Sequence, residues 1–440
     1  MSRRPFRLLV CLLVVATACT AESGSGTTES GSDTTESGSD TTESGSDTTE
    51  TESSTIPATE STVTTAIGPP PDLSDLPGRL VVVDSAGDIV TIDPDGSDPT
   101  PITDDAGRAA LYRQPTFSPV ADRLAWAELT SDGAGLGSSD GAGEDRIAVA
   151  MSSLPFFTYW SPDGSSIGVL HNGSQGSIEF EIVDVESATT EVLATGTPFY
   201  FSWSPESSQV AVHVELESFA TLDLEGNAND LGATAIGYQA PHWTPAGIIH
   251  LGENEIELRQ VDGSARALAT TPGPVAFVAN RQGTRLAVQY FVAGETPGIE
   301  AALSETPELP PNRVMVIDVE TGELSEVVDS PSIGLFWSPD GETLLALRPS
   351  SNRPGELATV IWRDGESTEL STFAPHPAFV EEVLQFFDQY GQSLQLWSPD
   401  SSAFALVGAI EGDSGVWVHP VEGGDPVDVY EGSWVSWSGS

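Results

Sequence analysis

The sequence of 440 residues contains no lysine, and its 16 arginines stand against 66 acidic residues. The formal net charge is −50 at pH 7. A surface of this sign repels the phosphates of nucleic acids and the headgroups of anionic lipids, so neither is an expected partner. It is compatible with cationic partners and with metal-bridged ones, although the same charge also serves solubility alone.

Cysteine and histidine are scarce as well. The two cysteines are Cys11 and Cys19, and Cys11 lies in an N-terminal apolar run that we expect to be removed. A mature chain with one thiol has no internal disulfide and no thiolate metal site. The six histidines are scattered without a metal-ligand spacing such as H-E-x-x-H. We therefore expect no metal, no other cofactor and no catalytic residue.

Long apolar runs are absent except at the N-terminus. Arg3, Arg4 and Arg7 precede the run 8–18, which suits a signal peptide and is too short to span a bilayer. The run ends in Ala16-Thr17-Ala18-Cys19, which resembles the bacterial lipobox. This resemblance implies removal of residues 1–18 and lipid attachment at Cys19, with an ordinary cleavage site as the alternative. The expected location is extracytoplasmic, with the protein held to the cell membrane by its lipidated N-terminus.

Residues 19–77 have the composition of a disordered tether. They contain no aromatic residue and almost no large apolar one, so they cannot bury a core. The phrase Thr-Thr-Glu-Ser-Gly-Ser-Asp begins at Thr27 and recurs at Thr34 and Thr41. The segment is acidic and lacks basic residues, so self-repulsion is expected to extend it.

From residue 78 onward, one short phrase recurs: an apolar stretch ends in an aromatic residue, and Ser-Pro and often Asp-Gly follow. The aromatic residue of each copy is called its anchor. The anchors are Phe117, Trp160, Trp203, Trp243, Trp337, Trp397 and Trp437, and a degenerate copy places Ala279 at this position. Proline, aspartate and glycine favour a tight turn, and a second apolar stretch after it indicates a hairpin. Four antiparallel strands in each forty-odd residues are typical of a β-propeller.

This phrase resembles the WD40-like repeat of the TolB family over residues 78–440. The resemblance implies an all-β propeller with the tryptophans as core residues between blades, but it implies no single function, because the fold hosts many. Eight anchors predict eight blades. Leu80–Val83 and Ile89–Ile92 lack a preceding strand and Trp434–Trp437 lacks a following one, so the two ends are predicted to share one blade. Seven blades are the alternative, because no clear fourth strand follows Ile147–Ala150.

Two serine motifs and one acidic loop resemble known catalytic or metal-binding motifs. Gly137–Gly141 matches the hydrolase pattern G-x-S-x-G, but we expect it in a loop rather than between a strand and a helix. Gly412–Gly415 resembles a serine-protease signature within an expected hairpin loop. Asp93–Asp98 lacks the closing glutamate of a calcium loop and is predicted to be a plain turn. None is assigned a catalytic or metal-binding role.

Three long insertions are expected at 130–145, 293–312 and 372–393, all on the face opposite the Ser-Pro turns. Insertions gathered on one face of a repeat protein often mark its binding face. The third has helical spacing, which predicts a helix on the rim or a lid over the channel mouth. Its apolar side comprises Phe379, Val380, Val383, Leu384 and Phe387, and its polar residues include Asp388.

The predicted function is a non-enzymatic binding or assembly module of the cell envelope. Its ligand is an envelope protein or glycan that the sequence does not name. The alternative is an envelope lyase or hydrolase acting on glycans or peptides, with a site of carboxylates at the propeller channel.

Overall fold

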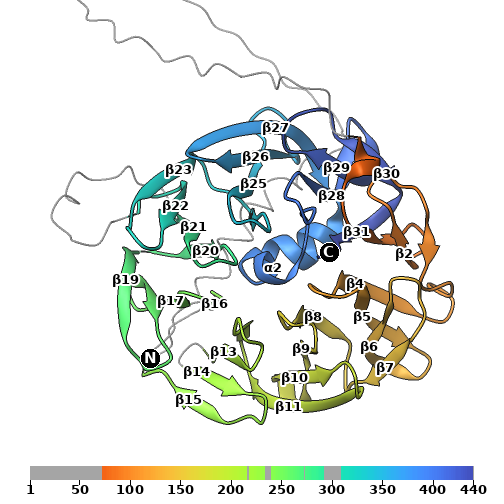
Figure 1. Cartoon of the computed structure of the whole chain (residues 1–440), viewed down its shortest axis with the longest axis horizontal. Helices are drawn as coiled ribbons and strands as arrows, with labels where there is room; N and C mark the ends of the chain where they lie inside the picture. The colour runs from red at the N-terminus through yellow and green to blue at the C-terminus, as the bar shows by residue number, and fades with distance from the viewer. Residues whose placement is uncertain (1–71, 216–217, 233–238, 272, 292–308, 440) are drawn as a thin grey trace, which may run out of the picture. The chain divides into compact units, whose positions relative to one another are not determined.

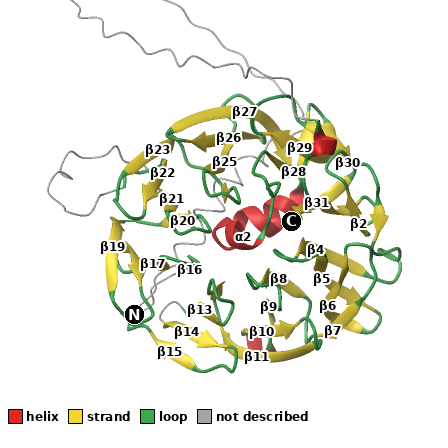
Figure 2. Cartoon of the chain, in the orientation of Figure 1, coloured by secondary structure: helices red, strands yellow, loops and turns green. Residues whose placement is uncertain are grey.

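The computed structural model describes residues 72–215, 218–232, 239–271, 273–291 and 309–439. The chain divides into two units, Met1–Thr65 and Ala66–Ser440, and all described residues belong to the second. The described part consists mainly of strands, as Figure 2 shows. No helix in these ranges is both long enough and apolar enough to cross a membrane.

The described strands form seven antiparallel sheets, six of four strands and one of seven. The first contains β1 (Leu80–Asp84), β2 (Ile89–Ile92), β3 (Thr100–Pro101) and β31 (Gly432–Trp437). The second contains β4 (Leu111–Phe117), β5 (Arg123–Thr130), β6 (Gly133–Asp140) and β7 (Ile147–Ala150). The third contains β8 (Pro155–Trp160), β9 (Ser166–Asn172), β10 (Ile178–Asp184) and β11 (Thr189–Gly196). The fourth contains β12 (Phe199–Trp203), β13 (Gln209–Val214), β14 (Ser218–Asp223) and β15 (Ala228–Asp230).

The fifth sheet contains β16 (His242–Thr244), β17 (Gly247–Leu251), β18 (Glu255–Arg259) and β19 (Ala265–Thr270). The sixth contains β20 (Val275–Ala279), β21 (Arg285–Tyr290), β22 (Val314–Asp318) and β23 (Leu324–Val328). The seventh contains β24 (Gly334–Trp337), β25 (Thr343–Pro349), β26 (Leu357–Arg363), β27 (Glu366–Pro375), β28 (Ala403–Ile410), β29 (Asp413–Pro420) and β30 (Val427–Tyr430). The helices are η1 (Leu73–Asp75), η2 (Ser174–Gly176), η3 (Phe379–Val383), η4 (Leu384–Phe386) and α2 (Phe387–Ser393).

The sheets follow one another in chain order around a common centre, where α2 lies (Figure 1). The predicted anchors fall at equivalent places in them. Phe117, Trp160, Trp203, Ala279, Trp337 and Trp437 each end a strand next to the centre, and Trp243 lies within β16. The degenerate copy at Ala279 thus keeps the register of the repeat although its side chain is small.

The indole N–H groups of several anchors join neighbouring copies of the repeat. In each case the acceptor is the carbonyl oxygen of the residue just before the preceding anchor. The bonds are Trp203 to Tyr159 (2.9 Å), Trp337 to Val278 (2.9 Å) and Trp397 to Phe336 (3.2 Å). Because these rings are also buried, the predicted role of these three tryptophans as core residues is confirmed, whereas Trp243 is half-buried.

The turn after each anchor is built from its own polar side chains. Ser161 Oγ donates to Asp163 Oδ1 (2.7 Å) and accepts from Ser166 N (3.0 Å). The fifth residue of the phrase has a left-handed backbone, which glycine adopts readily, and two copies have serine there, Ser207 (φ 59°) and Ser401 (φ 63°). The Ser207 hydroxyl accepts from the amide of Asp163 (3.0 Å), in the turn of the preceding sheet. The Ser401 hydroxyl accepts from Asp340 N in the same way (3.2 Å), so both serines offset the strain with a bond to the turn of the preceding copy.

Residues 130–145 are not an insertion, which corrects the prediction made from their glycine content. Gly133–Asp140 form β6, which pairs with β5 along its whole length. A Cβ on Gly137 would lie 2.3 Å from Nε1 of Trp126, and one on Gly135 would lie 2.5 Å from the carbonyl oxygen of Val149. Glycine is therefore needed for close packing within a strand. Ile147–Ala150 are therefore the fourth strand of this sheet. The sequence had shown no clear fourth strand here, which was the reason for the alternative of seven blades.

The two ends of the described chain pack together. β1 pairs with β2 on one side and with β31 on the other, in register from Leu80↔Trp437 to Val83↔Trp434. The Trp437 indole donates to the carbonyl oxygen of Pro77 (2.9 Å). Residues 72–77, which the sequence places at the end of the tether, carry the buried side chains of Leu73 and Leu76.

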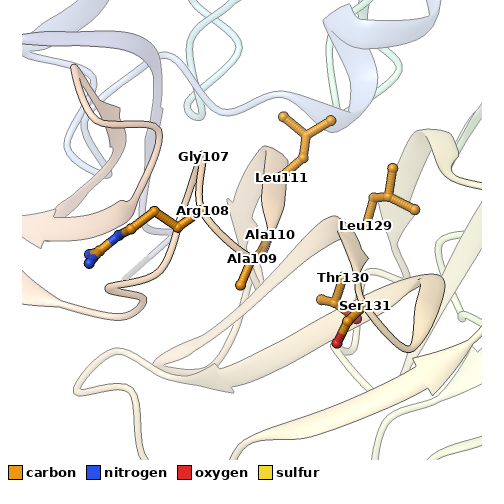
Figure 3. Close-up of a pocket in the computed structure, with 8 residues that line it drawn as sticks. All are labelled: Gly107, Arg108, Ala109, Ala110, Leu111, Leu129, Thr130 and Ser131. Atoms are coloured by element: carbon orange, nitrogen blue, oxygen red, sulfur yellow. The ribbon is translucent and has the colours of Figure 1, made fainter.

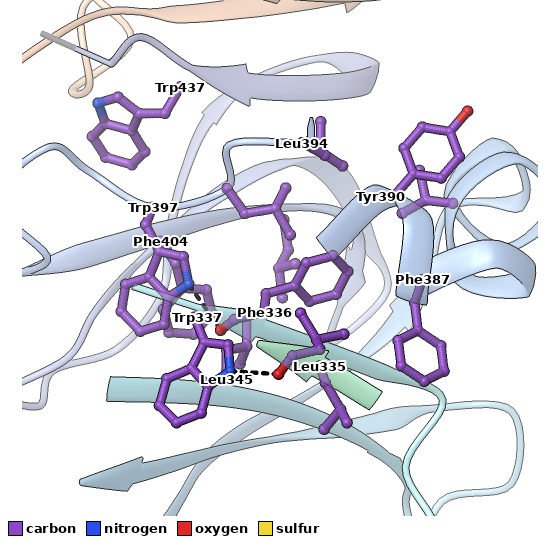
Figure 4. Packing of buried hydrophobic residues seen from close by; sticks show 14 of the residues in the cluster. Leu335, Phe336, Trp337, Leu345, Phe387, Tyr390, Leu394, Trp397, Phe404 and Trp437 are labelled. Carbon is purple, nitrogen blue, oxygen red and sulfur yellow. Dashed lines mark hydrogen bonds between the residues drawn. The ribbon is translucent and has the colours of Figure 1, made fainter. Parts of the chain in front are cut away.

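Residues 377–393, called the central segment, lie in the chain between β27 and β28 of the seventh sheet. Ala374 and Pro375 of β27 pair with one end of β28, and Trp397 forms a bridge to Phe404 near its other end. Between them the chain forms η3, η4 and α2, and α2 contacts β8, β12, β20 and β24. Figure 4 shows Phe387, Tyr390 and Leu394 packed beside Leu335 and Phe336.

The prediction for this segment was partly right. Phe379, Val383, Leu384 and Phe387 are buried as expected and Val380 is half-buried. The segment, however, contacts strands of several sheets at the centre, so it is not a helix on the rim. A lid over the channel mouth stays a prediction. Asp388, expected on the polar side, is buried. The second predicted insertion, 293–312, lies mostly outside the described residues. Because residues 130–145 include strand β6, the predicted clustering of three insertions on one face is wrong.

Candidate functional site

A pocket of about 360 Å³ lies beside the second sheet (Figure 3). Its walls come from the loop before β4 and from the turn after β5. Leu111 and Leu129, which line it, are cross-strand partners and are 41% and 44% exposed. Arg108 also lines the pocket, but its guanidinium points away from Leu111 and Leu129 (Figure 3) and donates to the carbonyl oxygen of Asp104 (3.2 Å). The pocket therefore offers an aliphatic surface formed by the two leucines.

The pocket lies at the end of the second sheet opposite its Ser-Pro turn. Leu111 begins β4, whereas Phe117 at its other end leads into the turn that holds Val120. Large exposed apolar side chains occur at this end of other elements too. We use the term binding face for Leu111, Leu129, Phe156 at the start of β8 and Phe386 of η4. The remaining large exposed apolar residues in the described part are the isolated valines Val120, Val192, Val261 and Val427.

Polar contacts connect the binding face to the central segment. Arg113 of β4 forms an ion pair with Glu382 (3.0 Å), and Gln114 Nε2 donates to the other carboxylate oxygen of Glu382 (3.0 Å). The Tyr390 hydroxyl donates to the carbonyl oxygen of Phe156 (3.1 Å). Phe386 lies in the chain between these two attachment points. The four residues of the binding face are thus carried by elements that contact one another.

Asp388 and His242 form a buried polar pair at the centre. Asp388 Oδ2 accepts from the amide of Ala240 (2.9 Å), and burial raises the pKa of this carboxyl to about 6. His242 Nε2 donates to the backbone carbonyl of Asp388 (3.0 Å), and its Nδ1 accepts from the amide of Ala279 (3.3 Å). Burial lowers the pKa of His242 to about 3, so the ring is neutral at pH 7. Each nitrogen of that neutral ring has a partner.

Two glutamines attach α2 to the surrounding strands. Gln389 Nε2 donates to the carbonyl oxygen of Phe201 (2.7 Å). Gln392 Nε2 donates to the carbonyl oxygen of Pro241 (3.1 Å), and its Oε1 accepts from the Ser202 hydroxyl (2.7 Å). Buried polar groups need such partners, and here the strands of the fourth and fifth sheets supply them. These contacts hold the segment to the strands beside it.

The serine motifs lie in strands, not in the loops expected for them. Ser139 lies in β6, is buried, and its hydroxyl donates to the carbonyl oxygen of Asp140 (2.8 Å). Ser414 lies in β29 opposite Ala409. Asp93–Asp98 form a turn between β2 and β3, as predicted, with Gly96 N donating to Asp93 O (2.8 Å). Cys19, the predicted lipid-attachment residue, lies outside the described residues.

Over the part of the chain that the structure describes, no three His, Cys, Asp or Glu side chains are grouped so that they could hold a metal ion. Five of the six histidines lie in four different sheets and His376 follows β27, as their scattered positions in the sequence suggested. The pocket was not predicted. Its only sequence signal is that Leu111 and Leu129 are apolar at strand positions next to inward-facing Tyr112 and Glu128.

No protein-family model and no curated protein matches the sequence. Among solved structures, the chain is similar to dihydro-heme d1 dehydrogenase NirN in complex with DHE (13% identity, TM-score 0.52, 85% of this chain and 76% of that chain covered). It is also similar to an oligogalacturonate lyase in complex with manganese (12% identity, TM-score 0.50, 78% and 98% covered). The described body is a β-propeller. TolB from Acinetobacter baumannii is also similar to it (14% identity, TM-score 0.37, 64% and 77% covered).

At such low sequence identity, structural similarity supports the propeller fold but says nothing about activity. The all-β propeller predicted from the TolB-like repeat is confirmed by the sheets and by the two likenesses with the higher TM-scores. The ligands named for those proteins belong to them.

Proposed function

We propose that this chain is a lipid-anchored, extracytoplasmic propeller of eight blades that acts as a binding or assembly module in the cell envelope. The observation that carries the binding role is the pair Leu111 and Leu129, exposed together at the rim of a pocket. Exposed apolar side chains that gather at one place on a strongly charged protein are typical of an interaction site.

The count of eight treats the seventh sheet as two blades. β24–β27 form one, and β28–β30 with residues 394–397 form the next, joined where β27 crosses from one to the other. The pairing of β31 with β1 supports a ring that is closed by the chain's own ends. In this arrangement the Ser-Pro turns occupy one face, and the binding face lies on the other.

The chemistry of the binding face favours a protein partner over a glycan. Leucine side chains offer sugar hydroxyls no hydrogen bond, whereas an apolar side chain of a partner gains roughly 1.5–3 kcal/mol when it is fully buried. The overall charge of −50 disfavours acidic partners at long range. A partner segment with apolar residues in the pocket and basic residues around it fits both features.

The alternative, a lyase or hydrolase with a site at the channel, has less support. The central segment lies where such a substrate would bind, and the side chains of Asp388 and His242 bond to backbone groups. Catalysis there would require the segment to leave the centre. A binding role needs no such change.

The binding role is tested by charge placed on the pocket. The double variant Leu111→Glu/Leu129→Glu is expected to lose its partner in pull-downs from native envelope extract, because two carboxylates would have to be desolvated at the contact. Val120→Glu is the matched control, since Val120 is exposed on the turn face. Equal recovery of the same partner by the double variant and the wild type would contradict this role.

Membrane attachment is tested separately. Cys19→Ala removes the proposed acylation site and is expected to release the protein from the membrane fraction into the soluble extracytoplasmic fraction. Stable anchoring needs acyl chains, because the apolar run 8–18 is expected to be cleaved off as part of the signal peptide. Membrane retention of the Cys19→Ala protein in cell fractionation would argue against a lipid anchor at this residue, whatever the fate of the binding role.

A further inference from the structure

Three side chains on the third sheet and the loop before it form a connected row. Ser152 Oγ lies 3.4 Å from His171 Nδ1, and His171 Nε2 lies 2.8 Å from Glu181 Oε2. The second carboxylate oxygen of Glu181 accepts from the Thr190 hydroxyl (2.5 Å). Ser152 is exposed, whereas the His171 side chain is only 1% exposed. The exposed Ser152 hydroxyl thus contacts a buried imidazole, which in turn contacts a carboxylate fixed by a second hydrogen bond.

The carboxylate determines which nitrogen of His171 carries the proton. An ionised Glu181 only accepts hydrogen bonds, so Nε2 donates to it and Nδ1 of the neutral ring has a free lone pair. The Asn172 carbonyl, 3.4 Å from Nδ1, cannot donate to that lone pair, whereas the Ser152 hydroxyl can. Once Nδ1 gains a proton, the same carbonyl can accept from it. The surroundings of His171 therefore suit both its neutral and its protonated forms.

A second His–Glu pair, in the fifth sheet, can be compared with the pair of His171 and Glu181. His250 Nε2 lies 3.1 Å from Glu257 Oε2, again between the second and third strands of a sheet. There Arg259 donates to the same carboxylate (2.6 Å), and His250 Nδ1 is buried with no partner among the described residues. No serine among the described residues bonds to His250 or Glu257, and the His250 side chain is only 2% exposed. The exposed Ser152 is what distinguishes the pair in the third sheet.

We propose that Ser152 is a nucleophile for acyl transfer from carboxylic esters, with His171 as its general base and Glu181 as the positioning residue. This goes beyond the binding role and does not depend on it. Nucleophile, base and orienting acid are in hydrogen-bond contact, and such contacts are often long before substrate binds. Phe156 adjoins Pro155, the cross-strand partner of His171, and offers an apolar contact to a substrate. Glu179, 3.9 Å from His171 Nε2, disfavours anionic esters.

The reaction proceeds in two balanced steps. His171 Nδ1 takes the Ser152 proton as Oγ forms a bond to the carbonyl carbon. The ester C–O bond then breaks, and the proton passes from Nδ1 to the leaving alkoxide. Water next gives a proton to Nδ1 and attacks the acyl-serine, and that proton returns to Ser152 Oγ as the carboxylic acid leaves. The roles follow those of other serine hydrolases, with the two ring nitrogens exchanged.

The test uses the full-length protein and a fluorophosphonate probe, with the modified peptide identified by mass spectrometry. The expected result is modification at Ser152, lost in Ser152→Ala and retained in Ser153→Ala, whose hydroxyl donates to Asn172 O instead (2.7 Å). Glu181→Gln is expected to slow labelling at least about tenfold and to change its pH profile, since the tautomer is no longer fixed. Glu257→Gln, in the matched pair of the fifth sheet, should leave the labelling rate unchanged.

Each variant is first checked for an unchanged melting temperature, so that a lost reaction is not a lost fold. Ser152→Ala removes only an exposed hydroxyl and should fold as the wild type does. Labelling of wild-type Ser152 that is no faster than labelling of Ser153 would overturn the proposal. So would a Glu181→Gln protein that folds and reacts at the wild-type rate.

Discussion

Removal of residues 432–440 is expected to prevent cooperative folding of the propeller. These residues include β31, whose side chains Trp434, Val435 and Trp437 are buried. The loss of one buried tryptophan side chain costs about 3–5 kcal/mol, and the whole stability of a domain is about 5–15 kcal/mol. The deletion also leaves β1 without its partner on that side. The measurement is thermal unfolding followed by circular dichroism.

The control for this deletion removes residues 439–440 alone and should melt close to the wild type. A melting curve for the 432–440 deletion that matches this control would refute closure of the ring by the chain's ends. A broad, non-cooperative transition or insoluble protein is the outcome that closure predicts, because an open edge next to β1 exposes unpaired backbone groups and apolar side chains.

Asp388→Asn is expected to stabilise the protein above pH 7 and to lose this advantage below pH 4. Burial raises the pKa of Asp388 from 3.8 to about 6, so the folded state binds its proton more tightly than the unfolded chain. The contribution of this group to stability is present below 3.8 and is lost as the pH rises through 6. Two pKa units correspond to about 3 kcal/mol at pH 8. Asparagine escapes this cost and can still accept from the amide of Ala240.

The measurement is the difference in melting temperature between Asp388→Asn and the wild type from pH 4 to pH 8. We expect this difference to rise by roughly 5 °C or more over the range. The low pKa values of His242 and His419, each about 3, act in the opposite direction, but they do so in both proteins and cancel in the difference. Glu381→Gln, at an exposed position of the same segment, should show no such trend. A difference that is constant with pH would mean that Asp388 is not a buried carboxyl in solution.

The repeat predicted the fold because its chemistry is local. The turn needs Ser, Pro, Asp and a residue that tolerates positive φ, and the anchor needs a large ring, so each copy is visible in the sequence. The same reasoning identified the unmarked strand end at Ala279 from its spacing. The reasoning failed for β6. Glycines are needed in that strand because a Cβ would clash with Trp126 or with the backbone of Val149, which lie on neighbouring strands.

The candidate sites were less visible because they depend on distant contacts. The spacing of apolar residues in 379–387 gave the buried side of the segment but not the place where it packs. Asp388 is buried beside the amide of Ala240, 148 residues earlier in the chain, and no local pattern contains that contact. The row Ser152, His171 and Glu181 comes from a loop and two strands, so it appears only when the third sheet is assembled.

The most direct test of the central claim, that the face opposite the Ser-Pro turns carries the function, is site-specific photocrosslinking in intact cells. A photoreactive amino acid would replace Leu129 on the binding face or Val120 on the turn face, both of which are exposed. The account predicts one discrete crosslinked product from position 129 and none from position 120. The same product from both positions, or a product from position 120 alone, would contradict it.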